Sequence, residues 1–75
     1  MVVARAIRAE RARAGMTQAQ LGEKLGWARS TVAVIEAGER PLQVHELPAV
    51  CRVLDVTFDE LVRKADPADR AALGL

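Results

Sequence analysis

Apolar side chains recur along this chain at the three- and four-residue spacing typical of helices, and glycine-containing or polar segments separate these recurrences. The first pattern spans residues 2–14 and places Val3, Ile7 and Ala14 on one face. Gly15 follows at the position where a helix is expected to end. We therefore expect a first helix whose arginines form its solvated side.

Two shorter patterns come next, close together in the chain. Thr17 and Gln20 have the spacing of a capping box, which predicts a helix over residues 18–25. Gly26 suits the left-handed conformation that ends many helices. A further helix is then predicted over residues 29–37.

Two short helices joined by a tight glycine-containing turn form the skeleton of a helix-turn-helix. Gly22 is small enough to let the second helix pack closely against the first. The side chains expected to face inward are Leu21, Leu25, Ala28, Val32 and Ile35. Together these features between Gln18 and Ala37 indicate a helix-turn-helix more specifically than any one of them alone.

Helical patterns continue through the second half of the chain. Pro48 has no backbone N–H to donate, so it fits best as the first residue of a regular helix, with residues 44–47 as a tighter lead-in turn. Thr57 and Glu60 predict a second capping box, which opens a helix that ends at about Lys64. The inward-facing residues of these helices are expected to be Leu47, Val50, Cys51, Leu54, Phe58, Leu61 and Val62.

These elements predict an all-α fold, a compact bundle of about five short helices within one domain. The helix-turn-helix domain is expected over residues 1–65, followed by a C-terminal tail or short helix over residues 66–75. Composition agrees, since 51% of residues are hydrophobic and only 3% are aromatic, which favours short helices over strands.

Charge and cysteine content limit the possible partners and the cellular location of the protein. Residues 1–40 hold seven basic and four acidic side chains, whereas residues 41–75 hold four basic and six acidic ones, so only the first half favours phosphates. Cys51 is the single cysteine, which excludes an internal disulfide and predicts a buried thiol. Neither a signal peptide nor a membrane span is present, so we expect a cytoplasmic protein.

An enzyme is not expected. His45 is the only histidine, and it lacks a nucleophile or metal-ligand cluster at a suitable spacing. Asp59 and Glu60 are explained by helix capping and the helix dipole. We expect no metal, no cofactor and no small-molecule ligand.

The chain closely resembles the lambda/434 repressor and Cro-like (XRE) helix-turn-helix family over roughly residues 5–64. The residues that carry the resemblance are Ile7, Arg8, Arg11, Gly15 to Leu21, Leu25, Gly26, Ser30 to Val32, Ile35 to Gly38, Leu47, Leu54 to Val56 and Phe58 to Leu61. The resemblance implies five helices, with the second motif helix in the major groove of double-stranded DNA. It also implies a homodimer on a two-fold operator.

Carried over position by position, the resemblance implies that Gln18 binds a backbone phosphate. Arg40 would reach a phosphate or the minor-groove edge. Arg11 and Glu36 match a pair that forms a salt bridge between the first helix and the recognition helix. The full implied set of DNA-binding residues is Thr17, Gln18, Arg29, Ser30, Thr31, Ala33, Val34 and Arg40.

Side-chain chemistry ranks these residues. Arg29 can donate two hydrogen bonds to guanine O6 and N7, with a simple phosphate contact as the alternative. Ser30 can bond a base or a phosphate, whereas Val34 can contact only a thymine methyl or has no DNA role. Direct readout of bases is therefore expected to be short, with some reliance on DNA shape.

Three positions depart from the family pattern. Ala28 stands where a hydroxyl N-cap is usual, so one amide of the recognition helix loses its customary partner. Trp27 replaces a smaller aliphatic residue and is expected either to be half-buried in the turn or to lie against the DNA backbone. Glu39 takes a place that is often basic or neutral, which weakens the case for a loop contact with phosphate.

The sequence therefore predicts a sequence-specific DNA-binding transcriptional regulator, a repressor that binds as a dimer. Phe58, Val62 and Leu73 are the expected interface residues. The alternative is an antitoxin-like or other interaction module, in which residues 65–75 would bind a partner protein. A further alternative is that the chain is the N-terminal domain of a longer regulator. A genuine stop after Leu75 would instead favour a stand-alone protein.

Overall fold

Five α-helices and one 3-10 turn make up most of the described chain. The computed structural model describes residues 3–63, so the expected tail or short helix over residues 66–75 lies outside the described residues. The elements are α1 (Ala4–Arg13), α2 (Gln18–Leu25), α3 (Arg29–Glu36), the 3-10 turn η1 (Val44–Glu46), α4 (Leu47–Leu54) and α5 (Phe58–Arg63). The expected all-α class and the five helices are confirmed.

Side-chain capping explains where α2 and α5 begin. The Thr17 hydroxyl accepts a hydrogen bond from the Gln20 amide at 3.0 Å, and the Gln20 side chain accepts one from the Thr17 amide at 2.8 Å. This is the expected capping box. At α5 the Thr57 hydroxyl accepts from the Glu60 amide at 3.1 Å, but the Glu60 carboxylate accepts from the Thr57 hydroxyl instead of its amide. The second box is therefore only half formed.

The lead-in to α4 follows the prediction with a one-residue difference. Residues Val44–Glu46 form the tighter turn, and α4 begins at Leu47, so Pro48 lies in the first turn of the helix rather than at its first residue. Proline is tolerated there because the amides of the first turn have no partner within the helix. Asp55 ends α4 with φ of 56°.

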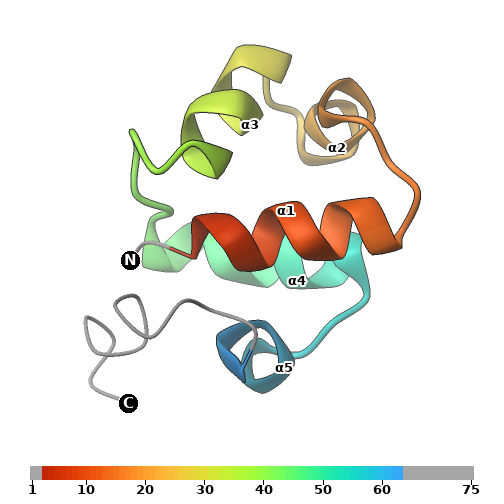
Figure 1. The fold of residues 1–75 in the computed structure, drawn as a ribbon, viewed down its shortest axis with the longest axis vertical. Helices are drawn as coiled ribbons and strands as arrows, with labels where there is room; N and C mark the ends of the chain where they lie inside the picture. Colours follow the sequence, from red (N-terminus) through yellow and green to blue (C-terminus); the bar gives the residue numbers. More distant parts are fainter. Residues whose placement is uncertain (1–2, 64–75) are drawn as a thin grey trace.

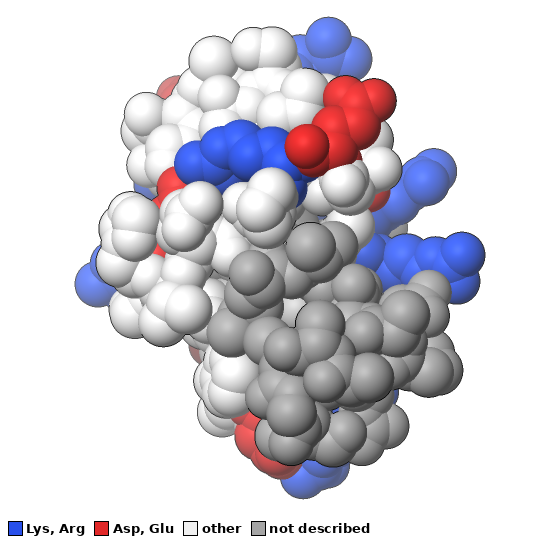
Figure 2. All heavy atoms as spheres, turned by 90° about the vertical axis from the view of Figure 1, so that its left-hand side faces the viewer, with Lys and Arg blue, Asp and Glu red and all other residues white. Residues whose placement is uncertain are grey.

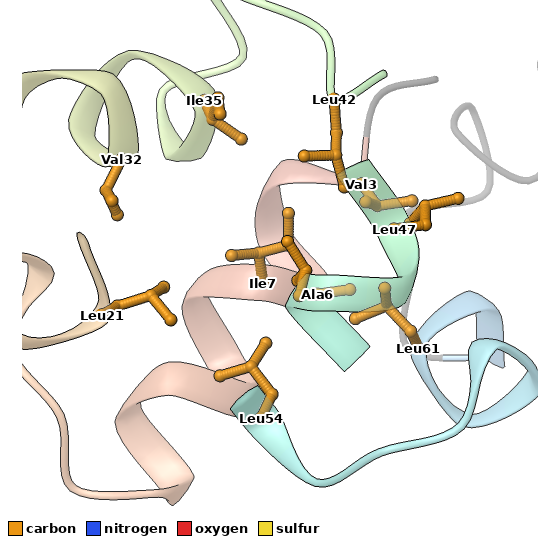
Figure 3. Close-up of a cluster of buried hydrophobic side chains, with 11 residues drawn as sticks. Val3, Ala6, Ile7, Leu21, Val32, Ile35, Leu42, Leu47, Leu54 and Leu61 are labelled. Atoms are coloured by element: carbon orange, nitrogen blue, oxygen red, sulfur yellow. The ribbon is translucent and has the colours of Figure 1, made fainter. Parts of the chain in front are cut away.

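The helices surround one apolar core. Figure 1 shows α2 and α3 together at one end of the molecule, α1 in front of α4 across the middle of the view, and α5 at the opposite end. Figure 3 shows side chains from all these elements converging on the space around Ile7 of α1. The core residues are Val3, Ala6, Ile7, Leu21, Val32, Ile35, Leu42, Leu47, Val50, Leu54 and Leu61. This core holds the α2–α3 pair against α1.

Four residues that were expected to be buried are exposed or only partly buried in the structure. Ala14 is exposed because α1 ends at Arg13, and Ala28 is exposed because it lies in extended backbone before α3. Phe58 remains 45% exposed at the first position of α5. Cys51 is only partly buried, although burial raises the pKa of its thiol.

Glu10 is a buried residue that the pattern of the sequence did not reveal. It lies on α1 and is 1% exposed, and its carboxylate accepts a hydrogen bond from Arg13 Nε at 2.7 Å. The hydrophobic pattern contains no sign that a charged residue of α1 is buried. Only the packing of α1 within the bundle determines that this side is covered.

Gly22 permits the close approach of α2 to the turn that follows it. A Cβ atom at this position would lie 2.7 Å from the backbone carbonyl oxygen of Trp27, nearer than real Cβ contacts allow. The packing role expected for Gly22 is therefore present, with the turn backbone as the closest neighbour.

Gly22→Ala is expected to lower the free energy of unfolding by about 1–2 kcal/mol, because the overpacking cost exceeds the gain in helix propensity. Chemical denaturation would measure this change. Ala19→Ser adds one atom on the exposed side of the same helix and is expected to stay within about 0.5 kcal/mol of the parent. A Gly22→Ala variant as stable as the parent would contradict the close packing.

Candidate nucleic-acid interface

A tight turn sets the angle between α2 and α3. Gly26 ends α2 in the left-handed region with φ of 73°, and the Trp27 amide donates to the Gly22 carbonyl at 2.8 Å. The Trp27 side chain is half-buried against the core, which is one of its two expected placements. Together these contacts close the turn, so the first turn of α3 has a fixed direction.

The first turn of α3 presents its side chains to solvent. Arg29 and Ser30 are exposed, while Thr31, Ala33 and Val34 are partly exposed further along the same helix. Arg29 makes no hydrogen bond or ion pair with any residue of the described part. Its guanidinium is therefore available to a ligand outside the chain.

No side chain caps the start of α3 in the described structure. Ala28 occupies the N-cap in extended backbone without a side-chain hydrogen bond. The amides of the first turn of a helix have no partner within the helix, and a hydroxyl at the N-cap would bond one of them. Its absence leaves amide donors beside the exposed side chains of Arg29 and Ser30.

The expected ion pair between Arg11 and Glu36 is present and joins α1 to α3. Arg11 Nε lies 2.6 Å from Glu36 Oε2, and Arg11 Nη2 donates to Glu36 Oε1 at 3.0 Å. The two side chains are 16% and 3% exposed, respectively. The hydrogen bond to Glu36 raises the pKa of Arg11 and outweighs the opposing effect of burial. This bidentate pair fixes the end of α3 that lies away from Arg29.

Gln18 and Thr17 make contacts that the resemblance did not imply. The Gln18 side-chain amide donates to Glu36 Oε1 at 3.2 Å, so Gln18 joins the Arg11–Glu36 pair. The hydroxyl of Thr17 belongs to the capping box of α2. Both residues lie at the start of α2, beside α3, and their contacts with DNA stay predictions.

Arg40 is held by an acidic side chain from the following turn. Arg40 Nη2 donates to Glu46 Oε2 at 3.0 Å, while the Gln43 amide donates to Glu46 Oε1 at 2.8 Å. The spacing of Gln43 and Glu46 resembles half of a capping box, so the sequence could have indicated the contact of Glu46 with the Gln43 amide but not its pairing with Arg40. A phosphate contact by Arg40 stays a prediction, and it competes with Glu46 for the guanidinium.

The Glu46 carboxylate has a shifted pKa. Burial favours its protonated form, but the hydrogen bonds from Arg40 and the Gln43 amide outweigh burial and hold the pKa of Glu46 below its usual value of 4.5. A carboxylate whose pKa is lower in the folded than in the unfolded state stabilises the fold at pH values above its unfolded-state pKa. This contribution is lost as pH falls through the folded-state pKa.

Glu46→Gln is therefore expected to reduce the free energy of unfolding at pH 7, and the reduction is expected to be smaller at pH 3 because the stabilising charge of Glu46 is lost as pH falls. Denaturation at the two pH values would measure the difference. Glu23→Gln, exposed on α2, serves as the control and is expected to stay within about 0.5 kcal/mol of the parent at pH 7. An equal loss from Glu46→Gln at both pH values would contradict this account.

The charge on the face shown in Figure 2 does not by itself mark the interface. Basic and acidic side chains both occur there, and one basic side chain crosses the upper part of this face next to acidic atoms. Within residues 3–63, no cluster of three or more potential metal ligands occurs. No helix of that part is long and apolar enough to span a bilayer. The interface is therefore identified by the α2–α3 geometry and its available donors.

Comparison with known protein families agrees with the helix-turn-helix geometry of α2 and α3. A helix-turn-helix family model matches residues 7–61. Among curated protein sequences, no significant match was found.

Several solved structures are similar to this chain. The restriction-modification controller protein C.AhdI from Aeromonas hydrophila is 27% identical, with a TM-score of 0.73 over 79% of this chain and 86% of that chain. The clp gene regulator ClgR from Corynebacterium glutamicum is 25% identical, with a TM-score of 0.81 over 97% and 76% of the two chains. The controller protein C.Esp1396I, solved as a tetramer with its natural 35 base-pair operator, is 29% identical with a TM-score of 0.72 over 83% and 87%.

Proposed function

The chain belongs to the XRE family of helix-turn-helix proteins, and from this premise we propose that it represses transcription by binding a two-fold DNA operator as a homodimer. Its broader function is that of a DNA-binding transcriptional regulator, as in the similar controller proteins and ClgR. In the proposed complex, α3 lies in the major groove, with Arg29 and Ser30 at the base edges.

The observation that carries this proposal is the exposed first turn of α3 on a fixed α2–α3 pair. Gly22 and Gly26 set the turn, and the core holds both helices against α1. Arg29, whose guanidinium has no partner among residues 3–63, is the first residue of α3. A rigid helix with a bidentate donor at its start suits the readout of a guanine.

Selection of bound sequences from a random pool of double-stranded DNA tests this function most directly. We expect enrichment of a sequence with two-fold symmetry, whose half-sites are about 10 base pairs apart from centre to centre. Binding is expected to weaken steeply as salt concentration rises. Failure to enrich any sequence, together with binding that does not depend on salt, would refute the proposal.

An apolar groove between η1, α4 and α5 supports the homodimer. The groove is lined by Val44, Leu47, Pro48, Cys51, Val56, Thr57 and Phe58. Val44 and Phe58 are 68% and 45% exposed, and they are the exposed large hydrophobic residues of the described part. Val62 does not fit its expected interface role because it is only 5% exposed within the fold, and Leu73 lies outside the described residues.

A second copy of the chain is the occupant that fits this groove. A two-fold operator requires two copies with α3 helices one DNA turn apart, and C.Esp1396I assembles as a tetramer on its operator. Sedimentation is expected to show a dimer at concentrations that bind DNA, and Phe58→Ser is expected to shift it toward monomer. A parent protein that is monomeric at those concentrations would refute this assembly.

Other functions receive less support. The family and the similar structures are DNA-binding regulators rather than enzymes. In the antitoxin-like alternative, the partner segment falls at residues 65–75, which lie outside the described residues. A cytoplasmic location remains part of the proposal because the protein must reach its operator.

A further inference from the structure

A polar hollow of about 270 Å³ lies where α1, the start of α2 and the side of α3 meet. Its lining residues are Arg8, Arg11, Gln18, Ala33, Glu36 and Ala37. We propose that Arg8 binds a backbone phosphate of the operator at this hollow and so extends the DNA interface onto α1. This inference rests on the proposed function and names a contact that the helix-turn-helix alone does not supply.

Arg8, rather than Arg11, has donors available for the phosphate. All three nitrogens of the Arg11 guanidinium donate within the fold: Nε and Nη2 to Glu36, and Nη1 to the Met16 carbonyl at 2.8 Å. Arg8 is exposed and makes no hydrogen bond or ion pair with any residue of the described part. One turn of α1 thus carries Arg11, which is bonded within the fold, and Arg8, which has no partner among the described residues.

The charge of the hollow favours an anion despite the carboxylate in its wall. Glu36 is 3% exposed, and its two oxygens accept hydrogen bonds from Arg11 and Gln18. The charges of Arg11 and Glu36 therefore cancel at short range. Arg8 has no partner among the described residues, so its charge is not compensated there. An exposed cation of this kind attracts a DNA phosphate.

The α3 side of the hollow leaves room for a phosphate. Ala33 and Ala37 are four residues apart, so they lie on one side of the helix and project only a methyl group each. A helix in the major groove has a DNA backbone along its flank. The hollow is lined on this flank by Ala33 and Ala37 of the α3 side, and Arg8 of α1 lines the same hollow. A phosphate beside α3 would then be reached from α1.

Arg8→Ala tests the inference through the salt dependence of operator binding. A lost phosphate contact is expected to weaken binding about equally for all sequences. It is also expected to reduce the slope of log K against log salt by about 0.9 per subunit. Arg52→Ala is the matched control, since Arg52 is also an exposed arginine without a partner in the described part but lies on α4, outside the hollow. Its slope is expected to stay close to that of the parent.

Further outcomes separate this inference from the proposed function. Arg8→Lys keeps the charge, so it is expected to retain the slope, and thermal melting should show that all variants are folded. An Arg8→Ala slope equal to that of Arg52→Ala would overturn the phosphate contact, as would a loss confined to one base position. A parent protein that enriches no DNA sequence would overturn the proposed function itself and the contact with it.

Discussion

Arg11→Ala is expected to lower the free energy of unfolding by about 3 kcal/mol, the lower end of the range for breaking a buried ion pair. The substitution leaves the Glu36 carboxylate, which is 3% exposed, without its bidentate partner. It also removes the hydrogen bond from Arg11 to the Met16 carbonyl, which ties α1 to the loop before α2. Urea denaturation followed by circular dichroism would measure the loss.

A second arginine provides the control for this experiment. Arg63 pairs with Asp59, but the two side chains are 73% and 69% exposed. Arg63→Ala is therefore expected to cost less than about 1 kcal/mol. The double substitution Arg11→Met with Glu36→Leu removes both charges and is expected to recover most of the stability lost in Arg11→Ala. Equal losses from Arg11→Ala and Arg63→Ala, with no recovery in the double variant, would contradict the structural role of the pair.

Local signals in the sequence were sufficient to predict the helices. The capping box of Thr17 and Gln20, the glycine after α2 and the proline in the first turn of α4 each act within a few residues. Hydrogen bonds of such short range depend little on the rest of the fold. For this reason the helix starts and stops agreed with the structure to within one or two residues.

Burial at the helix ends was harder to predict because it depends on the direction in which each helix leaves the core. Periodicity assigned Ala14 and Phe58 to the inner face, but both lie at ends where the chain turns outward. Glu10 is the reverse case, since the hydrophobic pattern gives no sign of a buried charged residue while the packing of α1 covers it. Side-chain type gives no information about these neighbours.

Some contacts of the candidate site could be anticipated from the sequence, and others could not. The Arg11–Glu36 pair could be anticipated from resemblance, and it is present in the structure. The link from Gln18 to Glu36 and the pairing of Arg40 with Glu46 could not, because each depends on where a long side chain comes to rest. These contacts change which donors are free for DNA. Of the residues implied by resemblance, Arg29 is left as the arginine with no partner in the described part.

Arg29 is therefore where the largest loss of DNA affinity is expected. Arg29→Ala should cost about 1–3 kcal/mol per half-site, and twice that for a dimer on two half-sites, because a bidentate contact with guanine is lost in each. The loss should be confined to one base position per half-site, which a competition series with single-base operator variants would reveal.

Arg29→Lys separates base readout from charge. Lysine keeps the positive charge at the start of α3 but lacks the rigid fork, so the preference for guanine is expected to weaken while the salt dependence stays near that of the parent. Alanine removes both. If Arg29→Ala weakened binding equally at every operator variant, and Arg29→Lys restored it fully, Arg29 would be a phosphate contact. Base recognition would then depend on Ser30, Val34 and the shape of the DNA.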